Sequence, residues 1–117
     1  MKKLPFGCRL LRQLPPMSEG ELLRQVLELA RLRGWLSFHA RPGRTAKGWR
    51  TPVQGAGAGF PALVLVRGTT LLFVELKADR GRLRRNQEVW LNLLRAAGQR
   101  VHVWRPSQWS DIEEVLA

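Results

Sequence analysis

Apolar residues recur with the period of an α-helix along the segment that begins at residue 18. Ser18 is a favourable N-cap, and Glu21 lies three residues later, where a capping box places its acidic partner. Gly34 then supplies a stop signal. The pattern predicts an amphipathic helix over residues 18–33, with apolar positions at Leu22, Leu23, Val26, Leu27, Leu29 and Ala30.

Shorter apolar runs have the composition of β-strands, rich in branched and aromatic residues. They are Trp35–His39, Pro61–Val66, Thr70–Leu76 and Val101–Trp104. The second and third runs are separated only by Arg67-Gly68-Thr69, which is a hairpin signal.

Two further helical patterns complete the chain, one from Leu83 to Ala97 and one from Ser107 to Leu116. The order helix, strand, hairpin, helix, strand, helix predicts an α/β fold in which helices flank a sheet. We expect one domain over residues 18–117, because 117 residues suffice for one core. Residues 1–17, punctuated by Lys, Pro and Gly, are predicted to be a flexible tail.

The charge is strongly positive and unevenly distributed. Lys and Arg number 20 against 9 Asp and Glu, a net charge of +11, and no acidic residue lies between Glu28 and Glu75. Residues 41–59 are rich in Arg, Gly and Ala without a period, so we expect a mobile basic loop. The excess of basic over acidic residues indicates a polyanionic partner. Nucleic acid is favoured over a membrane, because the basic residues lie mainly in predicted loops and not along one face of an amphipathic helix.

The chain contains a single cysteine, Cys8, which excludes a disulfide framework and a cysteine-based zinc site. No apolar run approaches the ~20 residues of a membrane span. The apolar residues near the N-terminus are interrupted by Pro5, Gly7, Arg9 and Arg12, unlike a secretory signal. We therefore expect a soluble, intracellular, cytoplasmic protein.

The predicted hairpin places two charged residues together. A turn at Gly68-Thr69 sets Arg67 opposite Thr70, and this register extends to Ala62 opposite Glu75. Alternation then puts Glu75 and Lys77 on one face of an otherwise apolar strand. Such a pair is either a strand-end ion pair or part of a functional site, and the neighbouring basic loop favours a site.

The chain resembles the VRR-NUC branch of the PD-(D/E)XK nucleases in several motifs. They are Gly59-Phe60-Pro61-Ala62-Leu63-Val64-Leu65-Val66, Val74-Glu75-Leu76-Lys77, Gln87, Ala30-Arg31 through Gly34-Trp35, and Val103-Trp104-Arg105-Pro106. The resemblance implies a restriction-endonuclease-like αβββαβ core with a mixed central sheet flanked by helices. It also implies an endodeoxyribonuclease that hydrolyses phosphodiesters with a metal-activated water, of a bacterial or phage-like type.

The resemblance further implies roles for single residues. Glu75 and the Leu76 carbonyl would ligate one or two Mg²⁺ or Mn²⁺ ions, a sparse site of the kind Mg²⁺ accepts. Lys77 would activate the attacking water or stabilise charge on the phosphate, and Gln87 would orient that lysine or the phosphate. Glu19 would be the carboxylate of the first helix; Glu21 is the competing residue, although a capping box explains it better.

Residue 62 departs from the family pattern, which has Asp after Gly-x-Pro where this chain has Ala62. Alanine cannot ligate a metal, so we expect weak metal binding and an inactive site. The survival of Glu19, Glu75, Lys77 and Gln87 favours an engineered inactive variant. A naturally degenerate, non-catalytic DNA-binding module is the alternative.

DNA is the expected partner, recognised by shape and charge because no helix carries a base-reading pattern. Small stand-alone members of the family resemble Holliday-junction resolvases, which act as homodimers; a nuclease with little junction preference is the other possibility. Leu22, Leu23 and Leu27 are the expected source of a dimer surface. Residues expected to contact DNA are Arg41, Arg44, Lys47, Trp49, Arg50, Arg80, Arg82, Arg84 and Arg85.

The other aromatic and titratable residues are interpreted as structural. Trp35, Trp90 and Trp104 fall on core periods, and Trp109 is expected to cover the last helix. His39 is either a phosphate contact or a half-buried strand-end residue. His102 and Cys8 are assigned no function.

Overall fold

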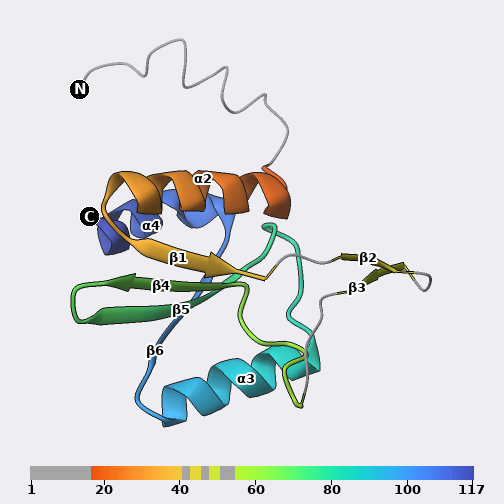
Figure 1. The fold of residues 1–117 in the computed structure, drawn as a ribbon. Coiled ribbons are helices and arrows are strands. Elements are labelled where there is room, and N and C mark those ends of the chain that lie inside the picture. The colour runs from red at the N-terminus through yellow and green to blue at the C-terminus, as the bar shows by residue number, and fades with distance from the viewer. Residues whose placement is uncertain (1–16, 41–42, 46–47, 51–54) are drawn as a thin grey trace.

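The protein is described by a computed structural model covering residues 17–40, 43–45, 48–50 and 55–117. Two helices pack on one face of a four-stranded sheet and a third helix packs on the other (Figure 1). The elements are, in chain order, α2 (Glu19–Leu32), β1 (Leu36–His39), β2 (Gly43–Thr45), β3 (Gly48–Arg50), β4 (Leu63–Arg67), β5 (Thr70–Leu76), α3 (Arg85–Ala96), β6 (Arg100–Trp104), the 3₁₀ turn Pro106–Gln108 and α4 (Trp109–Leu116).

The main sheet has the strand order β1-β4-β5-β6. Its first three strands are antiparallel neighbours, whereas β6 returns parallel to β5 after the crossover through α3. The predicted α/β fold with a mixed sheet flanked by helices, and its αβββαβ order, is confirmed.

Local chemistry fixes both ends of α2. The Ser18 hydroxyl accepts a hydrogen bond of 3.1 Å from the Glu21 backbone N–H, and the Glu21 carboxylate accepts one of 2.9 Å from the Ser18 backbone N–H. This is the predicted capping box. Gly34 adopts a φ of +81°, which an L-residue with a side chain rarely adopts, and the helix ends there.

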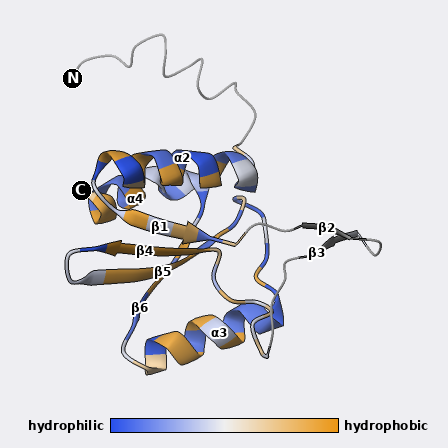
Figure 2. Ribbon diagram, in the orientation of Figure 1, coloured by the Kyte–Doolittle hydropathy of each residue, from blue (hydrophilic) through white to orange (hydrophobic). Residues whose placement is uncertain are grey.

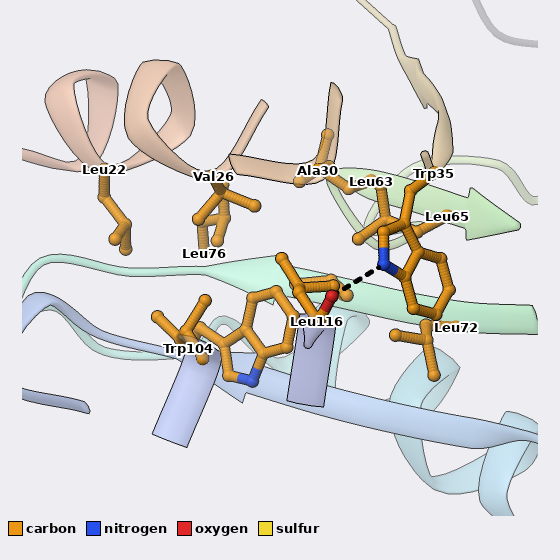
Figure 3. Close-up of a cluster of buried hydrophobic side chains, with 12 residues drawn as sticks. Leu22, Val26, Ala30, Trp35, Leu63, Leu65, Leu72, Leu76, Trp104 and Leu116 are labelled. Carbon is orange, nitrogen blue, oxygen red and sulfur yellow. Dashed lines mark hydrogen bonds between the residues drawn. The ribbon is translucent and has the colours of Figure 1, made fainter. Parts of the chain in front are cut away.

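The main core lies between the sheet and the layer of α2 and α4. Figure 3 shows Leu22, Val26 and Ala30 of α2 directed towards the buried side chains of β4 and β5. The Trp35 indole N–H donates a hydrogen bond of 3.1 Å to the Leu116 carbonyl within this layer, which ties β1 to the end of α4. Figure 2 shows the strongly hydrophobic β4 and β5 beside an α2 that alternates in polarity.

The apolar side of α2 is used inside the molecule, which corrects our expectation of a dimer surface there. Leu22 is fully buried, and Leu23 and Leu27 are half-buried against the same core. Met17, the one described residue of the predicted tail, also packs against this core; the rest of that tail, with Cys8, lies outside the described residues.

The predicted register of the β4–β5 hairpin is confirmed. Arg67 pairs with Thr70 and Val64 pairs with Phe73, and Gly68 has the positive φ of +61° that the tight turn needs. Because side chains alternate along a strand, Leu72, Val74 and Leu76 enter the main core. Phe73 and Glu75 therefore face the α3 side of the sheet.

The prediction of a loop without structure over residues 41–59 is wrong in part. β2 and β3 pair as a small antiparallel sheet, separate from the main one (Figure 1). Both strands are three residues long and rich in Gly and Arg, so they carry no alternation of apolar residues from which a strand could be predicted. The last predicted helix is likewise divided into the 3₁₀ turn and α4.

Candidate functional site

Glu75 is a buried carboxylate near the end of β5, with 3% of its surface exposed. Its Oε1 accepts a hydrogen bond of 3.1 Å from the Ala62 backbone N–H. Its Oε2 accepts one of 3.1 Å from the Gln87 side-chain amide. The two bonds fix the carboxylate between the segment that leads into β4 and the first turn of α3.

Gln87 connects this carboxylate to the helix backbone. Its side chain is 6% exposed, and while its Nε2 donates to Glu75, its Oε1 accepts a hydrogen bond of 2.8 Å from the Arg84 backbone N–H. That N–H is one of the donors that a helix N-terminus leaves without an intrahelical partner. The two contacts fix the direction of the amide group. The Gln87 side chain therefore both caps α3 and holds the Glu75 carboxylate.

Burial raises the pKa of Glu75 above its ordinary value, because removal from water penalises the charged form. The Lys77 charge, the Ala62 N–H and the Arg84 charge oppose this shift, whereas the Glu19 charge adds to it. Glu75 and Lys77 therefore act on each other electrostatically, as the sequence predicts.

Lys77 directly follows β5, and only 7% of its surface is exposed. Its backbone N–H donates a hydrogen bond of 3.0 Å to the Trp104 carbonyl, which continues the parallel pairing of β5 with β6. A lysine with so little exposure costs free energy unless charges or dipoles compensate it, and the carboxylate two residues earlier is one such partner.

The two acidic residues at the start of α2 differ in their contacts. Glu21 is the capping residue, and the hydrogen bonds with Ser18 lower its pKa. Glu19 is exposed in the same first turn, and its charge acts on Glu75. Of the two, Glu19 is the residue whose charge contributes to the raised pKa of Glu75.

The segment before Ala62 is held against α3 by contacts that the sequence did not predict. Gly59 has a φ of +89°, and a Cβ there would lie 2.7 Å from the Asn86 backbone, so no other residue fits without a shift. Phe60 meets Phe73 and Trp90 edge to face, with ring centroids 5.9 and 5.0 Å apart.

Trp90 completes this anchor, because its indole N–H donates a hydrogen bond of 2.9 Å to the Ala56 carbonyl. Its predicted packing role is confirmed by the Phe60 contact, but it is half-buried and lies outside the main core, whereas Trp35 and Trp104 are buried there. Trp109, partly buried, opens α4 and packs against that core. The Gly-x-Pro motif in the sequence could have indicated the close approach of Gly59 to α3. No motif near Trp90 could have predicted its contact with Ala56.

Basic side chains follow Lys77 along the chain, on the loop before α3 and at the start of that helix. Arg80 and Arg82 are exposed on the loop after Lys77, and Arg84 and Arg85 are exposed where α3 begins. Arg44, Trp49 and Arg50 belong to β2 and β3, of whose side chains nothing is described. Arg41 and Lys47 lie outside the described residues.

The two histidines lie on the edge strands of the main sheet. His39 is half-buried at the end of β1, and His102 is half-buried on β6 with its ring 5.3 Å from that of Trp104. Burial lowers the pKa of His102, which favours its neutral form.

The residues present do not complete a site for a divalent cation. Within the described ranges, no three His, Cys, Asp or Glu side chains gather at a distance suited to a metal. Both oxygens of Glu75 accept hydrogen bonds from the protein, and Ala62 has no side-chain oxygen to offer. Mg²⁺ requires near-octahedral oxygen coordination, which the described side chains of the chain as it stands do not provide.

Comparison with known proteins identifies one family. The family described as the VRR-NUC domain matches residues 13–108, which covers β1 to β6 and the whole candidate site. No curated protein matches the chain. In the described part of the chain, no helix is long and apolar enough to cross a membrane.

Proposed function

This chain belongs to the VRR-NUC domain family, which indicates a nuclease-type function, and we propose that it is a divalent-metal-dependent DNA endonuclease interrupted at residue 62. The observation that carries the proposal is the contact between Ala62 and Glu75. Ala62 occupies the position after Gly-x-Pro where the family pattern has an acid. Its backbone N–H lies 3.1 Å from the buried Glu75 carboxylate.

The surviving side chains fit the hydrolysis of a phosphodiester, in which water attacks phosphorus and the bond to a nucleoside oxygen breaks. Lys77 would place an ammonium group where charge develops on the phosphate oxygens. Gln87 would keep Glu75 in one orientation, as its amide does in this structure. Mg²⁺ or Mn²⁺ would supply the activated water, but only with a further carboxylate at position 62.

The chain as written is proposed to bind DNA without cutting it. An Asp at position 62 would lie against Glu75, because residue 62 directly precedes β4 and its backbone N–H is 3.1 Å from Glu75 Oε1. Loss of this one acid, with Glu19, Glu75, Lys77 and Gln87 retained, supports a deliberate substitution more than gradual decay.

Branched DNA, such as a four-way junction, is the proposed substrate. Arg80, Arg82, Arg84 and Arg85 are exposed next to Lys77 and would neutralise phosphates on either side of the cut. These contacts read charge and shape and carry no base sequence.

A homodimer is proposed because two symmetric nicks in a junction need two sites. The described apolar surface most suited to a second copy is on β1, an edge strand of the sheet, where Leu36 is 77% and Phe38 62% exposed. They pair with Val66 and Val64, so all four side chains share one face. An edge strand without Lys or Pro is open to pairing with another chain.

The decisive experiment compares this chain with Ala62→Asp on labelled four-way junction, flap, duplex and single-stranded DNA, with Mg²⁺ or Mn²⁺. We expect paired nicks near the junction from Ala62→Asp only. Ala62→Asn is the control of similar size without charge, and Ala62→Asp combined with Lys77→Met tests the lysine; neither is expected to cut.

The outcomes distinguish the proposal from its competitors. Cutting of all substrates at equal rates would retain the nuclease and reject the junction preference, which must be compared at matched salt. DNA binding without cutting by Ala62→Asp would reject the enzyme in favour of a non-catalytic binding module. Sedimentation of the chain and of Leu36→Glu tests the dimer, which the variant should dissociate.

A further inference from the structure

We infer that Arg105 is a positioning residue that holds the loop after Lys77 in place; the inference deepens the proposed function and rests on it. Arg105 directly follows β6, and its side chain reaches back to the loop between β5 and α3. Its Nη1 donates hydrogen bonds of 2.7 Å to the Ala78 and Gly81 carbonyls and one of 3.3 Å to the Asp79 carbonyl.

Three carbonyl dipoles with their negative ends at one point repel one another unless a positive charge lies between them. The guanidinium supplies that charge, and hydrogen bonds from a charged donor are stronger than those between neutral groups. Because the group is planar and its N–H directions are fixed, it also sets the shape of the loop, which the flexible ammonium of a lysine cannot do.

Further contacts tie the same loop to the segment after β6. The Ser107 backbone N–H donates a hydrogen bond of 2.9 Å to the Asp79 carboxylate. Within the loop, the Gly81 N–H donates one of 2.9 Å to the Ala78 carbonyl. The Lys77 N–H is bonded to Trp104. The chain from Lys77 to Gly81 is therefore held at several points by residues 104–107.

The loop in turn determines where the Lys77 side chain lies. A Cβ on Gly81 would be 3.6 Å from Lys77 Cδ, so the aliphatic part of the lysine lies alongside this glycine. Movement of the loop would expose Lys77 and shift Arg80 and Arg82 relative to the site. Arg105 thus acts on the proposed site through the loop and needs no contact with DNA.

Arg67 provides a matched control, because it makes similar contacts elsewhere. Its guanidinium donates to the Arg33, Leu116 and Ala117 carbonyls at 3.0, 3.3 and 2.8 Å and lies over the Trp35 ring. It sits at the turn of the β4–β5 hairpin, at the opposite end from Glu75. Both arginines bind carbonyl groups, but Arg105 alone of the two contacts the loop after Lys77.

The first arm of the test needs no nuclease activity. Arg105→Lys and Arg67→Lys are compared with the unaltered chain by hydrogen exchange of the amides in residues 78–82 and by the rate of Lys77 acetylation. For Arg105→Lys we expect both rates to rise about tenfold, since a flexible ammonium group does not reproduce the fixed contacts of the guanidinium with the loop carbonyls. Arg67→Lys should leave both rates unchanged; equal rates in all three proteins would overturn the inference.

The second arm measures turnover in the Ala62→Asp background. Arg105→Lys should lower the single-turnover cleavage rate at saturating DNA about tenfold, with less than about a threefold change in DNA affinity, because the exposed arginines keep their charge. If Arg105→Lys makes the loop of residues 78–82 mobile but leaves the cleavage rate unchanged, the positioning role is overturned. If Ala62→Asp cuts no DNA, the proposed function fails, while the first arm still decides whether Arg105 fixes Lys77.

Discussion

The Ala62 backbone N–H donates a hydrogen bond of 3.1 Å to Glu75 Oε1, so position 62 lies against the one buried carboxylate of the described residues. Any side chain at position 62 is therefore close to that carboxylate. An acid there has two consequences that can be separated by measurement. Without metal it adds a second negative charge to a buried group, and with metal it completes a pair of carboxylates.

Ala62→Asp should therefore lower thermal stability in EDTA and regain stability in Mg²⁺ or Mn²⁺. Like charges destabilise each other, whereas a metal bound only by the folded state stabilises it, by about 2.7 kcal/mol at a hundredfold excess over its Kd. Thermal unfolding with and without metal measures both effects. The parent chain and Ala62→Asn should show no metal-dependent shift; a shift of equal size in either would place the metal elsewhere.

The raised pKa of Glu75 predicts a pH dependence of stability with a defined sign. Between the ordinary pKa of the unfolded chain and the raised folded value, the folded state retains a proton that the unfolded state has lost. Stability contributed by this group therefore falls as the pH rises through that window. The difference in free energy of unfolding between Glu75→Gln and the parent should therefore shift in favour of the variant as the pH rises through this window. Above the window the difference should stay constant.

Urea unfolding of both proteins from about pH 4 to about pH 8 measures that difference. Glu21→Gln is the control with the opposite sign. The pKa of Glu21 is lowered by its hydrogen bonds with Ser18, so its contribution is lost as the pH falls. Parallel curves for the parent and Glu75→Gln would show that Glu75 titrates as an exposed carboxyl group does.

Gln87→Ala should destabilise the protein more than the loss of a helix cap alone. The substitution removes the cap on the Arg84 N–H and also leaves Glu75 Oε2 without its donor in a buried position. A buried group without its partner costs about 1–3 kcal/mol. Ser18→Ala, which removes only an exposed cap, should cost about 1 kcal/mol. Equal losses in urea unfolding would show that the Gln87–Glu75 contact adds nothing.

The features predicted from the sequence are those set by local chemistry. The capping box of α2 needs only Ser18 and Glu21, and the hairpin register follows from Gly68 and the alternation of the two strands. That register, extended beyond β4, predicts Ala62 beside Glu75, and the hydrogen bond between the Ala62 N–H and the Glu75 carboxylate agrees with it.

The features missed depend on contacts between distant segments or on strands without an apolar pattern. β2 and β3 are too short and too polar to have one. The Phe60–Trp90 contact and the carbonyl groups bound by Arg105 join segments that are remote in sequence. No local spacing identifies such partners, because they meet only after the sheet and α3 have packed.

Gly59 offers a test of how strictly the segment before the site must lie against α3. Gly59→Ala places a methyl group 2.7 Å from the Asn86 backbone at a φ of +89°, so both the backbone and the helix must shift. Gly55 is the matched control, because it also has a positive φ of +66° but nothing within 4 Å of an added Cβ. Gly55→Ala should cost about 1–2 kcal/mol from the left-handed backbone alone.

Gly59→Ala should cost roughly 1–3 kcal/mol more than Gly55→Ala, the usual cost of inserting a methyl group into a packed site. Urea unfolding of both variants measures the difference. In the Ala62→Asp background, Gly59→Ala should also weaken metal stabilisation, since the shift moves residue 62 relative to Glu75. A Gly59→Ala protein as stable as Gly55→Ala and with unchanged metal stabilisation would show that this segment can move without disturbing the site.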